Sequence, residues 1–170
     1  MRYAIASDIH GSALWCRRML ESAAAEGAGG LILLGDLMYH GPRNALPEGY
    51  DPAEVASMLN GFGGAVAAVR GNCDAEVDQM LLDFPCMGDY AVVEDGPLRM
   101  LCTHGHLDAA PFLAAEAGIS VVLSGHSHVK EDVCRSGVRY LNPGSVSIPK
   151  DGSHSYILYG DGRFDFRDLG

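Results

Sequence analysis

Short apolar runs alternate with longer amphipathic stretches through the first two thirds of the chain. The apolar runs predict strands buried on both faces, and they span Arg2–Ala6, Leu31–Leu34 and Ala65–Val69. Between the first two, Ser12 is the expected N-cap of a helix over Ala13–Glu26. Strand–helix–strand repetition of this kind predicts a parallel sheet with right-handed crossovers.

Further helices are expected where polar capping residues precede periodic apolar positions. Asp51-Pro52 combines a cap with a proline at the first helical position, and predicts a helix that ends near Asn60. A third, short helix is expected over Asp74–Leu82, with Asp74 as its cap. The intervening loop Asp36–Tyr50 is rich in Gly and Pro, and loops of this length are often functional.

The last third of the chain changes to short strands joined by turn dipeptides. The dipeptides are Asp95-Gly96, Ser136-Gly137 and Asp161-Gly162, each a hairpin signal. The strands on either side are Tyr90–Glu94 and Arg99–Thr103, Val133–Arg135 and Val138–Leu141, and Tyr156–Tyr159 and Arg163–Phe166. Val121–Ser124 adds one more buried strand. The whole pattern predicts an α/β fold with two sheets packed together and helices outside.

Composition narrows the classes of partner. With 48% hydrophobic residues, the 170-residue chain can bury a core, and we expect one domain over residues 1–170. The 12 Lys and Arg against 22 Asp and Glu leave a net charge of −10, so no long nucleic acid or anionic membrane is expected as a partner. A small anionic substrate stays compatible, because a bound metal can reverse the local charge.

The expected cellular compartment is inferred from three features that the sequence does not show: a membrane span, a signal peptide and paired cysteines. No apolar run approaches the roughly 20 residues of a membrane span, and the N-terminus has no apolar segment of the kind found in signal peptides. The five cysteines are odd in number and lack CxxC spacing. This favours a reduced, cytoplasmic protein without a thiolate metal site.

Polar side chains able to bind metal ions follow five predicted strands, at the edge where α/β sheets bind ligands. They are Asp8, His10, Asp36, Asn72, His104, His126 and His128. Seven ligands are too many for one tetrahedral ion, and suit two metals about 4 Å apart that share a carboxylate and a water. Mixed oxygen and nitrogen donors without sulfur fit Mn²⁺ first, with Zn²⁺, Fe²⁺, Mg²⁺ or Ni²⁺ as alternatives.

The motifs D-x-H, GD, GN-x-D, HGH and GH-x-H, in this order, resemble the calcineurin-like metallophosphoesterase superfamily. Arg70–Asp74, His40–Pro47 and Asn142–Pro149 resemble its YfcE-type bacterial phosphodiesterases. The resemblance implies a two-sheet β-sandwich flanked by helices, the αββα architecture. It also implies two metal sites, one held by Asp8, His10, Asp36 and His128, the other by Asp36, Asn72, His104 and His126.

The implied activity is metal-dependent hydrolysis of a small phosphodiester by a metal-bridging hydroxide, with Asn72 near the phosphate oxygens. Cys73 stands where most of the superfamily has a histidine that assists the leaving group. A thiol is a weaker proton donor than an imidazolium, so diesters with good leaving groups should be favoured. Cys73 is a catalytic candidate, and simple packing is the alternative.

Several residues keep two interpretations. His106 either contacts substrate or hydrogen-bonds a metal ligand, and Arg43 and His40 either line the pocket or lie at the surface or a subunit contact. His154 is expected at the plain surface, and the segment Asn142–Ser145 as a structural turn beside the site.

Other functions stay open at this point. The same metals could serve a phosphomonoesterase or a nuclease, and a eukaryotic retromer subunit with a similar fold makes a non-catalytic scaffold the third hypothesis. A homo-oligomer is compatible with each of them.

Overall fold

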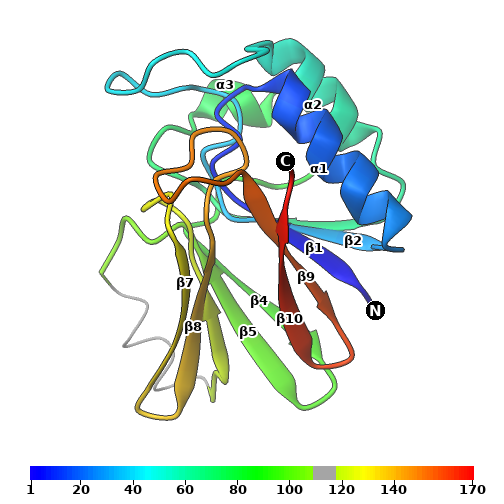
Figure 1. Cartoon of the computed structure of the whole chain (residues 1–170), viewed down its shortest axis with the longest axis vertical. Coiled ribbons are helices and arrows are strands. Elements are labelled where there is room, and N and C mark those ends of the chain that lie inside the picture. Colours follow the sequence, from blue (N-terminus) through cyan, green and yellow to red (C-terminus); the bar gives the residue numbers. More distant parts are fainter. Residues whose placement is uncertain (109–117) are drawn as a thin grey trace.

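The computed structural model describes residues 1–108 and 118–170. Two five-stranded sheets pack against each other, and the described helices lie over the outer face of one of them (Figure 1). The elements in chain order are β1 (Tyr3–Ala6), α1 (Ala13–Ala25), β2 (Gly30–Leu33), α2 (Pro52–Asn60), β3 (Ala65–Ala68), α3 (Glu76–Gln79), β4 (Tyr90–Asp95), β5 (Leu98–Thr103), β6 (Val121–Leu123), β7 (Lys130–Arg135), β8 (Val138–Pro143), β9 (Ser155–Gly160) and β10 (Arg163–Asp168).

The first sheet has the order β10-β9-β1-β2-β3. Its β1, β2 and β3 are parallel, as predicted, and the β9–β10 hairpin joins β1 in antiparallel fashion. The prediction that the Ala65–Val69 run is buried on both faces is wrong for β3. That strand lies at the edge of the sheet, so its residues are only partly covered.

The second sheet has the order β4-β5-β6-β8-β7, with β5, β6 and β8 parallel. Its two hairpins, β4–β5 and β7–β8, confirm the predicted strand pairs. One turn differs from the prediction. Asp95 still pairs with Leu98, so the loop is Gly96-Pro97, with the positive φ of 59° at the glycine. A glycine first in a two-residue loop is typical of a type II′ turn.

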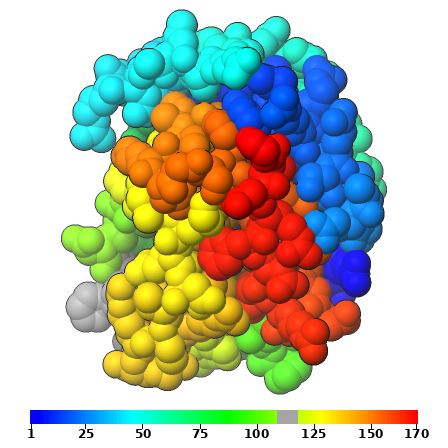
Figure 2. All heavy atoms as spheres, in the orientation of Figure 1, coloured from blue at the N-terminus to red at the C-terminus, as the bar shows by residue number. Residues whose placement is uncertain are grey.

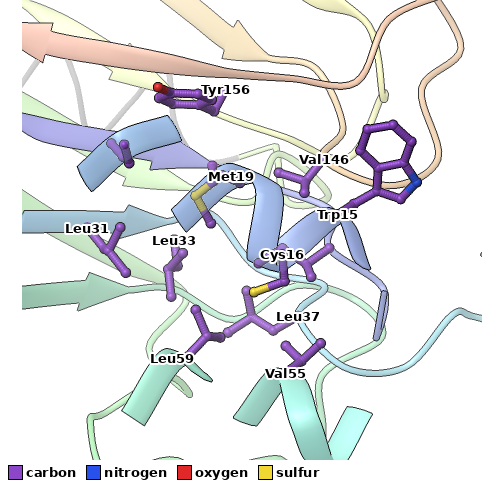
Figure 3. Close-up of a cluster of buried hydrophobic side chains, with 14 of the residues drawn as sticks. Trp15, Cys16, Met19, Leu31, Leu33, Leu37, Val55, Leu59, Val146 and Tyr156 are labelled. Carbon is purple, nitrogen blue, oxygen red and sulfur yellow. The ribbon is translucent and has the colours of Figure 1, made fainter. Parts of the chain in front are cut away.

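Three layers of apolar side chains hold these elements together. Figure 3 shows the layer between the first sheet and the helices, where Met19 of α1 and Leu59 of α2 are buried with Leu31 and Leu33 of β2. A second layer joins the two sheets, and a third lies on the outer face of the second sheet around Val122. Alternate residues of β1 and β2 face different layers, which explains why both strands are apolar throughout.

Helix ends follow their capping chemistry with one exception. Ser12 caps α1 and Asp51 caps α2, as predicted. The third helix is only Glu76–Gln79, and its N-cap is Ala75 rather than Asp74. Among the described residues, no helix is both long enough and apolar enough to cross a bilayer.

Candidate metal centre

Five buried side chains from both sheets converge beyond the carboxyl ends of the central strands. Asp8 and His10 follow β1, Asp36 follows β2, His104 follows β5 and His128 follows β6. Oδ1 of Asp8 lies 3.2 Å from Nε2 of His128 and 3.5 Å from Nε2 of His10. Nε2 of His104 lies 3.4 Å from Oδ2 of Asp36. These five predicted ligands therefore form one cluster.

The histidine tautomers in this cluster are set by backbone carbonyls. Nδ1 of each buried histidine faces a carbonyl oxygen, which can only accept, so Nδ1 carries the hydrogen and Nε2 of the neutral ring carries the lone pair. The pairs are His10 with Tyr39 at 2.8 Å, His104 with Leu34 at 2.6 Å, and His128 with Ile148 at 2.6 Å. Nε2 of His10 and Nε2 of His128 then face each other at 3.3 Å. Two facing lone pairs beside a carboxylate suit a cation.

A buried carboxylate oxygen also fits a metal ion. Oδ2 of Asp8 accepts a hydrogen bond from the backbone N–H of His126 at 3.0 Å, but Oδ1 is buried with no hydrogen-bond partner among the described residues. Such an oxygen is costly unless a cation or donor satisfies it. Asp8, His10 and His128 have ligand atoms within 4.8 Å of one another, as do Asp8, Asp36 and His104. These donors fit a divalent transition ion.

Asp36 lies between the two groups. Its Oδ2 is 3.7 Å from Nε2 of His10 and 3.4 Å from Nε2 of His104. Its Oδ1 accepts a hydrogen bond from the backbone N–H of Cys73 at 2.8 Å. This position is the one that a bridging carboxylate requires.

Burial and charge within the cluster shift the pKa values of Asp8, Asp36 and His104. Burial raises the pKa of Asp8, but contacts with His10 and His128 outweigh it and lower that pKa; His104 does the same for Asp36. Burial lowers the pKa of His104, whereas the carboxylates of Asp36 and Asp8 raise it to a net value of about 9. A metal ion at this position would therefore have to displace the proton of His104.

Asn72 and His126 lie at the border of the cluster. Oδ1 of Asn72 is 3.1 Å from Nε2 of His104, and the rings of His126 and His104 have centroids 5.1 Å apart. The His126 ring belongs to none of the groups of converging ligand atoms. Burial and the charge of His104 lower the pKa of His126, which keeps it neutral, as a metal ligand must be.

The backbone around the cluster is strained. Residues that carry side chains seldom adopt positive φ, and five of the predicted ligands do so. Their φ angles are 57° for Asp8, 47° for His10, 54° for Asp36, 68° for His126 and 60° for His128. A Cβ on Gly71 would overlap Asp36, and one on Gly125 would overlap Ser7. Strain concentrated in one cluster indicates a functional constraint.

Asp74 corrects one expectation. Instead of capping a helix, its carboxylate accepts backbone hydrogen bonds from Asp36 at 2.8 Å, Leu37 at 2.9 Å and Gly71 at 2.7 Å. Burial raises the pKa of Asp74. The residue therefore ties the loop after β2 to the loop after β3. The sequence does not indicate this role, because an Asp before a helix is usually a cap.

The turn predicted beside the site lies there and supports it. Oγ of Ser145 donates a hydrogen bond to the carbonyl oxygen of Asp8 at 2.8 Å, and Ser147 donates a second at 3.2 Å. Nδ2 of Asn142 donates to the carbonyl oxygen of Gly125 at 2.7 Å. The end of β8 and the segment after it therefore hold the backbone at two of the ligand loops.

A cleft of about 930 Å³ opens onto the cluster. Arg43 lines it, in agreement with one of its two interpretations, and Tyr39 and Lys150 line it without having been predicted. Their only sequence signal is a position in Gly- and Pro-containing loops next to the motifs. His40 packs edge-on between Tyr39 and Tyr50, with centroids 4.7 and 5.4 Å away, and does not line the cleft.

Cys73 lies in this cleft beside Asp36. Its sulfur accepts a hydrogen bond from Nδ2 of Asn72 at 3.3 Å. Burial, together with the carboxylates of Asp36 and Asp74, raises the pKa of the Cys73 thiol to about 12. The thiol is thus protonated, at a position open to a ligand.

Two other histidines, His106 and His154, have their rings close to another ring. The ring centroid of His106 is 5.4 Å from that of His104, and His106 Nδ1 is buried without a hydrogen-bond partner among the described residues. Burial lowers the pKa of His106.

The expectation of a plain surface residue is wrong for His154. Its ring stacks on Trp15 with centroids 3.4 Å apart, and its Nδ1 bonds the carbonyl of Val146 at 2.9 Å.

Comparison with known proteins places this arrangement in a family. The calcineurin-like phosphoesterase superfamily domain matches residues 1–161. Phosphodiesterase YfcE from Escherichia coli K12 is 50% identical over 153 residues, covering 90% of this chain and 83% of its own. A solved structure of Escherichia coli YfcE aligns with a TM-score of 0.84 and 39% identity over the whole of both chains. Vps29 from Entamoeba histolytica aligns at a TM-score of 0.69 with 17% identity over both whole chains, a likeness of fold alone.

Proposed function

Because the chain belongs to the calcineurin-like phosphoesterase superfamily, we propose that it is a phosphodiesterase that hydrolyses a small phosphodiester with two divalent metal ions. The observation that carries the proposal is the orphaned Oδ1 of Asp8 among Nε2 atoms whose lone pairs face inward. That environment is costly without a cation and favourable with one.

The residues divide between two sites that share Asp36. Asp8, His10, Asp36 and His128 hold one ion, and Asp36, Asn72, His104 and His126 hold the other, with Mn²⁺ as our first choice from the donor set. When bound, the ions supply the positive charge that activates a water and binds phosphoryl oxygens. Two divalent ions and two aspartates leave a net charge near +2, enough to attract a phosphate group into an acidic protein.

The remaining side chains orient the reaction. The Asn72 amide lies beside His104 and can donate a hydrogen bond to a phosphoryl oxygen, which stabilises charge that develops there. The protonated Cys73 thiol faces the same cleft, where it can donate only weakly to a leaving oxygen. His106, neutral and close to His104, is a candidate substrate contact. These three side chains favour hydrolysis of diesters with good leaving groups over hydrolysis of monoesters.

The size and charge of the chain support a restricted substrate class. A net charge of −10 disfavours long nucleic acids, so we propose small phosphodiesters as the substrates of one catalytic domain. The free cysteines support action in the reducing cytoplasm.

The proposal is tested by metal removal. Protein stripped with a chelator should lose hydrolysis of bis(p-nitrophenyl) phosphate, and Mn²⁺ should restore it. Metal analysis of the purified protein should give about two ions per chain. Full activity in metal-free protein would overturn the two-metal assignment, and bound metal without hydrolysis of any diester would favour a scaffold.

A further inference from the structure

Basic side chains without partners are scarce in this acidic protein. The chain has 12 Lys and Arg against 22 Asp and Glu, and many of the cations pair with a carboxylate on the surface, as Arg139 does with Asp132. Across residues 1–108 and 118–170, the side chains of Arg43, Lys150 and Arg163 have no ion pair, hydrogen bond or ring contact. An unpaired cation in such a chain is available to a ligand.

Two of these three cations line the metal cleft. Arg43 comes from the loop between β2 and α2, and Lys150 comes from the loop between β8 and β9. Both loops lie at the same end of the molecule, in cyan and in orange (Figure 2). The two loops contact different residues at the site. Gly41 packs close to the sulfur of Cys73, and the backbone N–H of Lys150 donates to the carbonyl oxygen of His128 at 2.9 Å.

The cleft is larger than the reacting group. Small-molecule pockets range from about 300 to 1,000 Å³, so about 930 Å³ accommodates a substrate of nucleotide size rather than a phosphate alone. The carboxylates of Asp8, Asp36 and Asp74 are each engaged at the cluster or by backbone N–H groups, which leaves the Arg43 and Lys150 charges uncompensated. The two cations are therefore available to a part of a substrate other than the scissile bond.

Resting on the proposed function, we propose that Arg43 and Lys150 form a subsite for a second phosphate group of the substrate, separate from the diester that is cleaved. Guanidinium and ammonium groups are the usual protein partners of phosphate oxygens. Favoured substrates are then small phosphodiesters that carry an additional terminal phosphate.

A matched pair of substrates tests this with the Mn²⁺-loaded protein. Thymidine 5′-(p-nitrophenyl phosphate) is compared with the same compound bearing a 3′-phosphate, since both share one base and one leaving group. The extra phosphate should raise kcat/KM about tenfold, mainly through KM, because exposed cations contribute modestly. Arg43→Gln and Lys150→Gln should each lower that preference, and the double variant should remove it.

Arg163→Gln is the matched control, because Arg163 is equally unpaired but lines a different surface hollow. The Arg163→Gln variant should show the same preference for the 3′-phosphorylated substrate as the unmodified protein. Equal kcat/KM for the two substrates, or a preference that survives the double variant, would overturn the subsite while leaving the phosphodiesterase proposal standing. Hydrolysis of neither substrate, nor of bis(p-nitrophenyl) phosphate, would instead contradict the proposed function itself.

Discussion

At the scale of single residues, the centre depends on side chains that have no alternative partner. The inward Nε2 atoms of His10, His104 and His128 cannot turn away, since each Nδ1 is bonded to a carbonyl. Asp8 and Asp36 are buried among them. Removing one side chain therefore leaves the others in place with their charges unbalanced, and the consequences depend on where the lost group stood.

Asp36→Asn should be the most damaging single change at the centre. Its Oδ2 lies between His10 and His104, so the change weakens both proposed metal sites. We expect kcat/KM for an activated diester to fall by at least ~100-fold, the upper range for partners of metal ligands. The His10→Ala variant should bind more metal and retain more activity than the Asp36→Asn variant, because only one of the two proposed sites loses a ligand. Equal metal content and rate in Asp36→Asn and the unmodified protein would refute the bridging role.

Cys73 should govern leaving-group preference. Its thiol, with a pKa of about 12, donates poorly, whereas a well-placed imidazolium contributes ~10²–10⁴-fold. Cys73→His should improve poor leaving groups relative to good ones, by about tenfold or less because no supporting contacts await a new ring. Cys73→Ala should leave the activated diester nearly unchanged. The ratio of kcat/KM values for the two leaving groups is the measurement, and a constant ratio would reduce Cys73 to packing.

At the scale of elements, strands deliver the ligands and loops hold them. The described helices contribute apolar faces to the core around Met19 and Leu59 (Figure 3) and no side chain to the metal cluster. The positive φ angles at Asp8 and Asp36 occur in the loops that follow β1 and β2, where the chain leaves the sheet. Hydrogen bonds from neighbouring loops maintain these turns. Asp74 accepts two of them, from Asp36 and Leu37, and a third from Gly71 in the loop after β3.

Asp74→Asn should weaken metal binding although Asp74 is not among the proposed ligands. An amide cannot accept all three backbone hydrogen bonds, and an unsatisfied buried donor costs about 1–3 kcal/mol. Asp78→Asn is the control, because Asp78 is also buried but accepts from Ala75 at the start of α3. Both variants should lower the free energy of unfolding in urea, and only Asp74→Asn should raise the Kd for Mn²⁺. Equal Mn²⁺ affinity in the two variants would show that Asp74 supports the fold alone.

At the scale of the whole molecule, the site joins the two sheets. Asp8, His10 and Asp36 belong to loops of the first sheet, and His104 and His128 to loops of the second. A cation bound among them would therefore link the two halves of the sandwich. Without it, Oδ1 of Asp8 has no hydrogen-bond partner among the described residues, and Nε2 of His10 faces Nε2 of His128 at 3.3 Å.

Metal should consequently raise thermal stability. A ligand at 100 times its Kd adds about 2.7 kcal/mol to the free energy of unfolding, provided that it binds only the folded state. For a chain of this length, each kcal/mol corresponds to roughly 2–4 °C, so Mn²⁺ should raise Tm by about 5–10 °C. The shift should grow with Mn²⁺ concentration and shrink in Asp36→Asn. A Tm independent of Mn²⁺ in the unmodified protein would contradict a centre that links the sheets.

The sequence by itself was enough for the strands, the two capped helices and the convergence of Asp8, His10, Asp36, His104 and His128. Apolar runs mark buried strands, and polar residues after parallel strands must meet at one sheet edge. Only the tertiary structure determined which residues surround the proposed ligands. Asp74 accepts a hydrogen bond from Leu37, 37 positions away, and His154 stacks on Trp15, 139 positions before it in the sequence. The local sequence pattern predicts strands, helices and helix caps. The contacts of Asp74 and His154 depend on how distant loops pack against one another, and residue spacing does not predict that packing.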